Sequence, residues 1–155
     1  MDYTKAGGRV VFGGFFASLM RIDRVKPFFQ NWGMDWDSAA YTSVEMVRNR
    51  RHELVKANAN AGSTGPGTRR SGADGTKLLP GEIHITALHL SGVGPDDAVY
   101  VAKAGTHLHE RGQVTKAAVV YAKVGEGWLG YIGDVGLVGE GHTKIVLAMF
   151  GLLRG

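Results

Sequence analysis

The most constraining feature of the sequence is the stretch KAAVVYAKVGEGWLGYIGDV, residues 116–135. Its first arm, Ala117 to Val124, is apolar with few polar positions, which is typical of a strand covered on both faces. The second arm, Trp128 to Val135, has the same character. The turn GEG at 125–127 has residues able to take a positive φ, as a tight antiparallel connection requires. The stretch therefore predicts a buried β-hairpin.

The same stretch matches the pattern GxGxxG, which is found in dinucleotide-binding loops. Such a loop must open a helix, so that the helix N-terminus faces the pyrophosphate. Here the residues after the second glycine, 128–132, are β-formers and continue as a strand. The pattern therefore favours a hairpin turn over a dinucleotide site.

Length and composition limit the class of protein. A chain of 155 residues with 44% hydrophobic content suits one domain with a real core, so we expect a single domain over 1–155. We find neither an apolar run of transmembrane length nor a secretory signal, so we expect a cytoplasmic protein without membrane contact. The absence of cysteine excludes disulfides, thiolate metal sites and cysteine nucleophiles. No cofactor is expected.

The N-terminal part predicts a strand, a sharp turn and a helix. Val10 to Phe12 is a short apolar run between glycine pairs, which indicates a strand that ends in a sharp turn. Apolar residues at three- and four-residue spacings then predict an amphipathic helix that begins near Asp23, with Pro27 in its first turn and Gly33 after its end. Its aromatic side chains are most simply core residues, with an aromatic ligand platform as the alternative.

The middle and the end of the chain add strands, a loop and a helix. Alternating residues over 39–51 predict a half-exposed strand, with a helix extending to Lys56 as the rival. Small polar residues over 57–77 predict a flexible loop, whose GSTGPGTRRS run lacks the lysine of a phosphate-binding loop. EIHITALHL and PDDAVYVAK predict two further strands, and TKIVLAMFGLLRG a final apolar helix that starts near His142 or Thr143.

One histidine pair has the spacing of metal ligands. On an extended backbone, His107 and His109 face the same side, and Glu110 is adjacent. These side chains could therefore be ligands of a zinc or copper ion. A structural zinc site normally needs four ligands, and the others would have to come from His84, His89, His142 or an aspartate. An ordinary polar loop is the alternative.

The order of these elements suggests layers of helices around a sheet. The runs GGRVVFGGFFASLMRIDRVKPFFQNWGMDWDSAAYTS, ITALHLSGV, VYVAK, VGEGWLGYIGDVG and HTKIVLAMFGL together resemble uncharacterised fungal proteins similar to class I glutamine amidotransferases. The resemblance covers nearly the whole chain except 57–77. It implies an α/β fold with a three-layer, flavodoxin-like sheet, here without the first third of the domain and with an antiparallel hairpin near the C-terminus.

The resemblance also implies where a site would lie. VVFGGFFASL is similar to the strand and turn that carry the nucleophilic cysteine of a working amidotransferase, and Phe15 stands at about that position. GYIGDVG is similar to the strand end that would carry the catalytic histidine, where Gly133 and Asp134 stand. Glutamine hydrolysis needs a thiolate and a base, so we expect none. A ligand pocket is expected at Gly13, Gly14, Phe15, Ser18, Gly133 and Asp134.

Three functions follow as hypotheses. The first is a non-catalytic domain that binds a small ligand or a protein partner, and is oligomeric because the missing strands would leave a sheet edge and an apolar face bare. The second is a hydrolase with replaced groups: Ser18, Asp134 and either His107 or His109. The third is nucleic-acid binding by a basic cluster, for which a solvated basic surface is the simpler interpretation; its members are Arg48, Arg50, Arg51, Lys56, Arg69 and Arg70.

Overall fold

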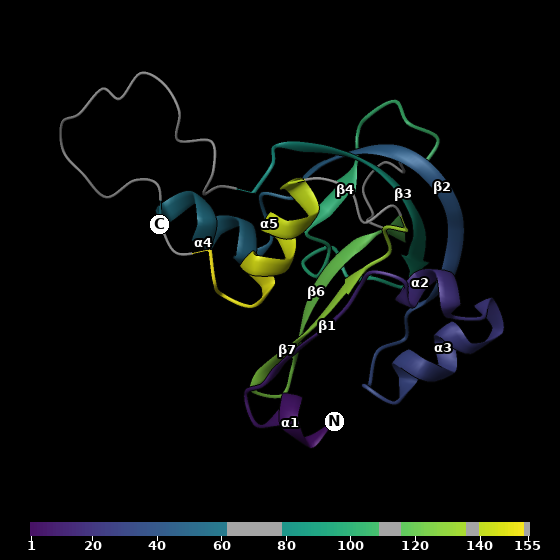
Figure 1. The fold of residues 1–155 in the computed structure, drawn as a ribbon, viewed down its shortest axis with the longest axis vertical. Helices are drawn as coiled ribbons and strands as arrows, with labels where there is room; N and C mark the ends of the chain where they lie inside the picture. The colour runs from purple at the N-terminus through teal and green to yellow at the C-terminus, as the bar shows by residue number, and fades with distance from the viewer. Residues whose placement is uncertain (62–78, 109–115, 136–139, 154–155) are drawn as a thin grey trace.

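The computed structural model describes residues 1–61, 79–108, 116–135 and 140–153 (Figure 1). The helices are α1 (Asp2–Lys5), α2 (Phe16–Leu19), α3 (Ile22–Gln30), α4 (Glu53–Ala61) and α5 (Glu140–Met149). The strands are β1 (Arg9–Phe12), β2 (Asp37–Arg48), β3 (Glu82–Ser91), β4 (Tyr100–Ala102), β5 (Lys116–Ala117), β6 (Val119–Val124) and β7 (Gly127–Ile132).

The described strands form two sheets. The three-stranded sheet has the order β1-β7-β6, with β1 parallel to β7 and β7 antiparallel to β6. The four-stranded sheet has the order β4-β2-β3-β5 and is antiparallel throughout. Its two long strands, β2 and β3, curve around one end of the three-stranded sheet (Figure 1). The mixed α/β class is therefore confirmed, with pairing that is mostly antiparallel.

The predicted hairpin is confirmed as β6 and β7. Its turn includes Gly125 at φ +63, where a side chain would be strained and would also meet the backbone of Lys5. Both strands are buried along almost their whole length, as the apolar pattern indicated. One detail differs from the prediction, because Ala117 belongs to β5 and pairs with Leu90 of β3. The chain thus changes sheet just before β6 begins.

Helices cover both faces of the three-stranded sheet. On one face, Ile132 and Tyr121 belong to a first core cluster together with Met149 of α5. On the other face, Leu129 belongs to a second cluster with Phe29 of α3. Side chains alternate along a strand, so one strand serves both cores. Figure 1 shows the result: α4 and α5 lie to one side of the sheet, and α2 and α3 to the other.

Helix α3 begins one residue before the predicted start and carries Pro27 in its interior, beyond the first turn. A proline there leaves the carbonyl of Asp23 without its helical donor. Asp23 is exposed, so water can satisfy that carbonyl. The expectation that Pro27 would be confined to the first turn is therefore wrong, because the short helix is open to solvent on that side.

Two predicted boundaries also need correction. Residues 39–48 form part of β2 as expected, but α4 then covers 53–61, so the first five residues of the predicted loop 57–77 are helical. The rest of that loop lies outside the described residues. The last helix, α5, starts at Glu140 and ends at Met149, earlier at both ends than predicted. Glycine at 151, with φ +71, follows the helix end.

Candidate functional site

The two segments proposed to form a ligand pocket leave the three-stranded sheet at the same edge. β1 runs parallel to β7, and Phe12 is the register partner of Tyr131. The chain beyond each strand therefore starts side by side at the carboxyl ends of the strands, where ligands of α/β sheets usually bind. A β-carbon placed on Gly13 would lie 3.6 Å from the β-carbon of Ile132.

The first segment, residues 13–18, is a turn leading into α2, here called the elbow. Gly14 has φ +63, which lets the chain reverse sharply. Phe15 follows with an ordinary helical φ and is 64% exposed, so its ring is not part of a core. Ser18 is also exposed, on the outer side of α2. Behind the elbow, the rings of Phe12 and Phe16 pack against the second core, tilted by 31° with centroids 4.8 Å apart.

Gly133, in the second segment, joins the two sheets. Its N–H donates to the carbonyl of Ala118 at 2.8 Å, and its own carbonyl accepts the N–H of Leu88 at 3.1 Å. A β-carbon at this position would overlap the carbonyl oxygen of Leu88 and lie 2.8 Å from the hydroxyl of Tyr131. The backbone of β3 therefore occupies the space beside Gly133.

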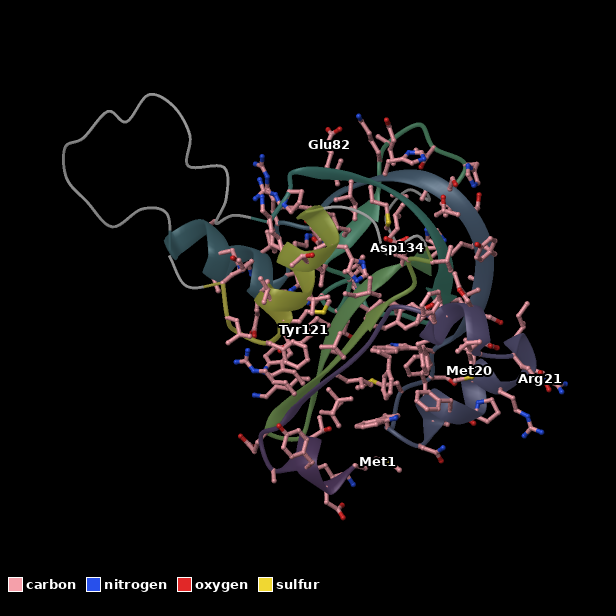
Figure 2. The ribbon with its side chains drawn as sticks, viewed as in Figure 1. Met1, Met20, Arg21, Glu82, Tyr121 and Asp134 are labelled. Atoms are coloured by element: carbon pink, nitrogen blue, oxygen red, sulfur yellow. The ribbon has the colours of Figure 1, made fainter. Side chains whose placement is uncertain are left out.

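Asp134 is the next residue and lies against α5. Its Oδ2 is 3.5 Å from Nδ1 of His142, and both side chains are largely buried, at 16% and 15% exposed. Asp134 also forms an isolated bridge with Ala87 of β3. Figure 2 shows Asp134 beside β3, at the far end of β7 from the hairpin turn. An acid–imidazole pair thus lies at this strand end, supplied by the segment that follows β7 and by the first turn of α5.

This pair lines a cavity of about 320 Å³ between β3, the end of β7 and α5. The remaining polar groups are the side chains of Glu82 and His84 on β3, and Glu82 is held by Lys103 at 2.9 Å. No lining residue in the described part of the chain carries a hydroxyl or a thiol; the full set is Pro80, Glu82, Ile83, His84, Ile85, Ile132, Asp134, Gly141, His142 and Ile145. The cavity can therefore hold a small polar ligand, but it offers no side-chain nucleophile of those two kinds.

The cavity and the elbow occupy opposite faces of the three-stranded sheet. Ile132 and Ile145, which line the cavity, belong to the first core. Ala17 and Phe16 of α2 belong to the second core. The two expected halves of the pocket therefore share a sheet edge, while their side chains point into different cores. Only Asp134 of the six expected residues lines this cavity.

The residues of the hydrolase hypothesis lie on separate elements. Ser18 is on α2, whereas the imidazole paired with Asp134 is that of His142. His107 follows β4, is exposed, and has its Nε2 3.2 Å from the hydroxyl of Thr42 on β2. His109 lies outside the described residues. The sequence predicts His142 near the start of the last helix and as a possible further zinc ligand, but not as a partner of Asp134; its position in the first turn of a helix next to GYIGDVG was the available signal.

The predicted metal site depends on His107 and His109. Within the residues that the structure describes, no group of three or more histidine, aspartate or glutamate side chains is arranged to hold a metal ion. Because His109 and Glu110 are outside that part, the predicted pair itself stays a prediction.

Only part of the predicted basic cluster lies in the described residues. Arg51 and Lys56 flank the start of α4 and line a second hollow, together with Trp128 of the hairpin. Arg69 and Arg70 fall in the range that the structure does not describe. The sequence showed no aromatic residue near the basic cluster, because Trp128 is distant in the chain and only the fold brings it close.

A buried histidine that no local sequence pattern singles out, His52, caps α4. The Nε2–H of His52 donates to the carbonyl of Tyr121 at 2.8 Å, and its Nδ1 accepts the N–H of Leu54 at 3.0 Å. His52 is 1% exposed, and burial lowers the pKa of its imidazole below the usual value. These bonds hold one neutral tautomer, so His52 has a structural role at the helix start.

Comparison of the chain with protein-family models, with curated proteins and with solved structures found no match. None of the helices in the described ranges has the length and apolar character needed to cross a membrane. The geometry of the site is therefore the basis for a functional conclusion.

Proposed function

We propose that this chain is a non-catalytic, amidotransferase-like binding domain that holds a small zwitterionic ligand of amino-acid size in the cavity at the end of β7. The main support for this proposal is the pair formed by Oδ2 of Asp134 and Nδ1 of His142, 3.5 Å apart. The pair lies in a cavity of about 320 Å³ whose described lining has no hydroxyl or thiol. Covalent catalysis needs an activated nucleophile next to such a base. A carboxylate and an imidazole alone suit ligand binding.

Two features support the likeness to amidotransferases and a flavodoxin-like arrangement. The elbow after β1 and the segment after β7 start side by side at the carboxyl ends of two parallel strands, where the resemblance implies the two catalytic segments, although their side chains point into different cores. The parallel pair β1–β7 is also covered by helices on both faces. Phe15 and Asp134 stand where the resemblance implies a cysteine and a histidine, which is consistent with lost glutaminase chemistry.

The charges around the cavity suggest the class of ligand. Carboxylates such as Asp134 accept hydrogen bonds from ammonium or amide groups. The imidazole of His142, in the first turn of α5, lies where the helix dipole favours a negative group. Apolar side chains from Ile85, Ile132 and Ile145 can cover a short aliphatic segment. An amino acid such as glutamine combines all three kinds of group.

Isothermal titration calorimetry with L-glutamine tests this proposal. We expect the unmodified chain to bind glutamine, and the Asp134→Asn variant to bind it at least about tenfold more weakly, because a hydrogen bond to a charged group contributes about 1.5–3 kcal/mol. Glu126→Gln is the matched control, since Glu126 is an exposed carboxylate at the opposite end of the hairpin. This control should bind like the unmodified chain.

An ammonia-release assay on the same samples separates binding from hydrolysis. We expect no ammonia above the background. Release that disappears in His142→Gln would replace the proposal with a hydrolase that uses water and the Asp134–His142 pair. Absence of glutamine binding up to about 10 mM, a level weaker than ordinary metabolite affinities, would reject the amino-acid ligand.

A further inference from the structure

A second hollow lies on the same face of the three-stranded sheet as α5, at the start of α4. Its volume is about 300 Å³, within the range of small-molecule sites. It is formed by the first turn of α4, the turn before β4 and the strands of the hairpin. The lining residues are three cations, three carboxylates, two aromatic rings and one histidine: Arg51, Lys56, Lys123, Glu53, Asp96, Asp97, Tyr121, Trp128 and His52.

Two stacked rings form one wall of this hollow. Tyr121 and Trp128 are parallel to within 5°, with centroids 4.8 Å apart. Tyr121 is the inner ring: it is 3% exposed, and its hydroxyl donates to the carbonyl of Met149 at 2.6 Å. In Figure 2, Tyr121 lies below α5 and toward the hairpin turn. Trp128 is only partly buried. An indole supported in this way is a suitable surface for a planar ring, because every nucleobase has a π-face that can stack.

Positive groups border the indole. Lys123 is the register partner of Trp128 on the neighbouring strand, so both side chains leave the sheet on the same face. Arg51 and Lys56 stand at the start of α4, where the helix dipole adds positive potential. Such a set of cations next to a stacking surface suits a phosphate attached to an aromatic ring.

Negative groups complete the hollow and limit the size of the anion. Asp96 and Asp97 come from the turn before β4, and Glu53 from the first turn of α4. Within the described residues, no ion pair joins Glu53, Asp96 or Asp97 to any of the three cations. Carboxylates can accept the hydroxyls of a sugar, but they repel a chain of phosphates. Equal numbers of both charges thus favour one phosphate over a polyphosphate or a nucleic-acid strand.

We propose that this hollow binds a nucleoside monophosphate. The base stacks on Trp128, the phosphate is held by Arg51, Lys56 and Lys123, and ribose hydroxyls donate to Asp96 or Asp97. The site is separate from the cavity of Asp134 and His142, so each proposal can fail without the other.

Titration of tryptophan fluorescence with adenosine monophosphate tests the proposal. We expect adenosine monophosphate to quench the fluorescence of the unmodified chain in a saturable way, and Trp128→Leu to abolish this quenching. The Lys56→Gln variant should bind the nucleotide about tenfold more weakly, as expected for one lost charged contact. Lys56 is exposed, so its replacement leaves the fold intact and keeps the test meaningful if Trp128→Leu is unstable. Trp32→Phe is the matched control, because Trp32 is a partly buried tryptophan of the opposite core and its loss should leave the affinity unchanged.

Three further ligands separate the parts of the proposed contact. Adenosine should bind more weakly than its monophosphate, inorganic phosphate should not quench, and adenosine triphosphate should bind no more tightly than the monophosphate. Equal affinity for adenosine and its monophosphate would overturn the role of the cations. Absence of quenching by adenosine monophosphate up to about 10 mM, or quenching that persists unchanged in Trp128→Leu, would overturn the proposal as a whole.

Discussion

Two buried histidines illustrate how single residues depend on the fold. The imidazole of His52 has both nitrogens satisfied by backbone groups, one as donor and one as acceptor. His89 on β3 is fully buried; its Nδ1–H donates to the carbonyl oxygens of Ala87 and Ala40, which lie 3.1 Å and 3.3 Å from Nδ1. Its Nε2 has no hydrogen-bond partner among the described atoms. Burial is the main cause that lowers the pKa of both imidazoles.

The lowered pKa values predict a loss of stability in mild acid. Between the folded pKa and the ordinary value of 6.5, the unfolded chain binds more protons than the folded chain. The free energy of unfolding should therefore be at its full value above about pH 6.5 and fall as the pH decreases below it. Urea unfolding at a series of pH values measures this slope.

His52→Gln is the informative variant for this slope. A glutamine amide can still donate to the carbonyl of Tyr121 and accept from Leu54, but it does not titrate. We expect the slope below pH 6.5 to become shallower in His52→Gln, and shallower again when His89→Gln is added. A slope that is the same in the double variant as in the unmodified chain would show that other groups cause the acid sensitivity.

At the scale of elements, the junction between the two sheets is the critical feature. The end of β7 contacts β3 through the hydrogen bond from Leu88 to Gly133 and through the bridge of Ala87 with Asp134. The hydroxyl of Tyr131 also donates to the carbonyl of Leu88 at 2.8 Å. This junction positions Asp134 against α5, so the site depends on a close approach that only glycine permits at 133.

Gly133→Ala should therefore be severely destabilising. Its β-carbon would overlap the backbone of Leu88, and backbone cannot move aside as a flexible side chain can. We expect a loss of about 3 kcal/mol in the free energy of unfolding, at the upper end of the usual cost of overpacking. Chemical denaturation measures it.

Gly13→Ala is the matched control at the same sheet edge. Its β-carbon would meet Ile132 at an ordinary 3.6 Å, and Gly13 is not among the glycines with positive φ. The change should stay within about 0.5 kcal/mol, as for most substitutions without a clash. An equal loss of unfolding free energy in Gly133→Ala and Gly13→Ala would contradict the close contact between Gly133 and β3.

At the scale of the whole molecule, one side of the three-stranded sheet remains open. In the described part of the chain, β1 pairs with β7 only, so no described strand covers its other edge. The elbow, α2 and the start of α3, which follow β1, expose three large apolar side chains, namely Phe15, Leu19 and Ile22. An unpaired edge strand near exposed apolar side chains is typical of a contact between subunits, and it favours the oligomer that the sequence predicts.

Leu19→Asp tests this contact, because Leu19 is the most exposed of the three side chains at 81%. We expect light scattering to give a mass of at least two chains for the unmodified protein and of one chain for Leu19→Asp, since a buried charge opposes association. Leu152→Asp, at an exposed apolar residue after α5, should keep the larger mass. A single-chain mass for the unmodified protein would refute the oligomer.

The sequence by itself determined the elements whose signals are local. The apolar arms and the glycine turn at 125–127 predicted the hairpin, and alternation predicted β2, because both patterns reflect the burial of neighbouring side chains along one strand. The sequence did not predict that the first residues of 57–77 are helical, because small residues without an apolar stripe do not indicate a helix. For the expected pocket, local patterns placed the elbow and the end of β7 at strand ends, and the resemblance placed both at one site.

Only the tertiary structure decided which faces these segments present. The pairing of Asp134 with His142 depends on how α5 packs against β7, and the approach of Trp128 to Arg51 and Lys56 depends on where α4 lies over the hairpin. Such contacts join residues far apart in the chain. They are set by the packing of two cores on opposite faces of one sheet, which no local pattern of residues encodes.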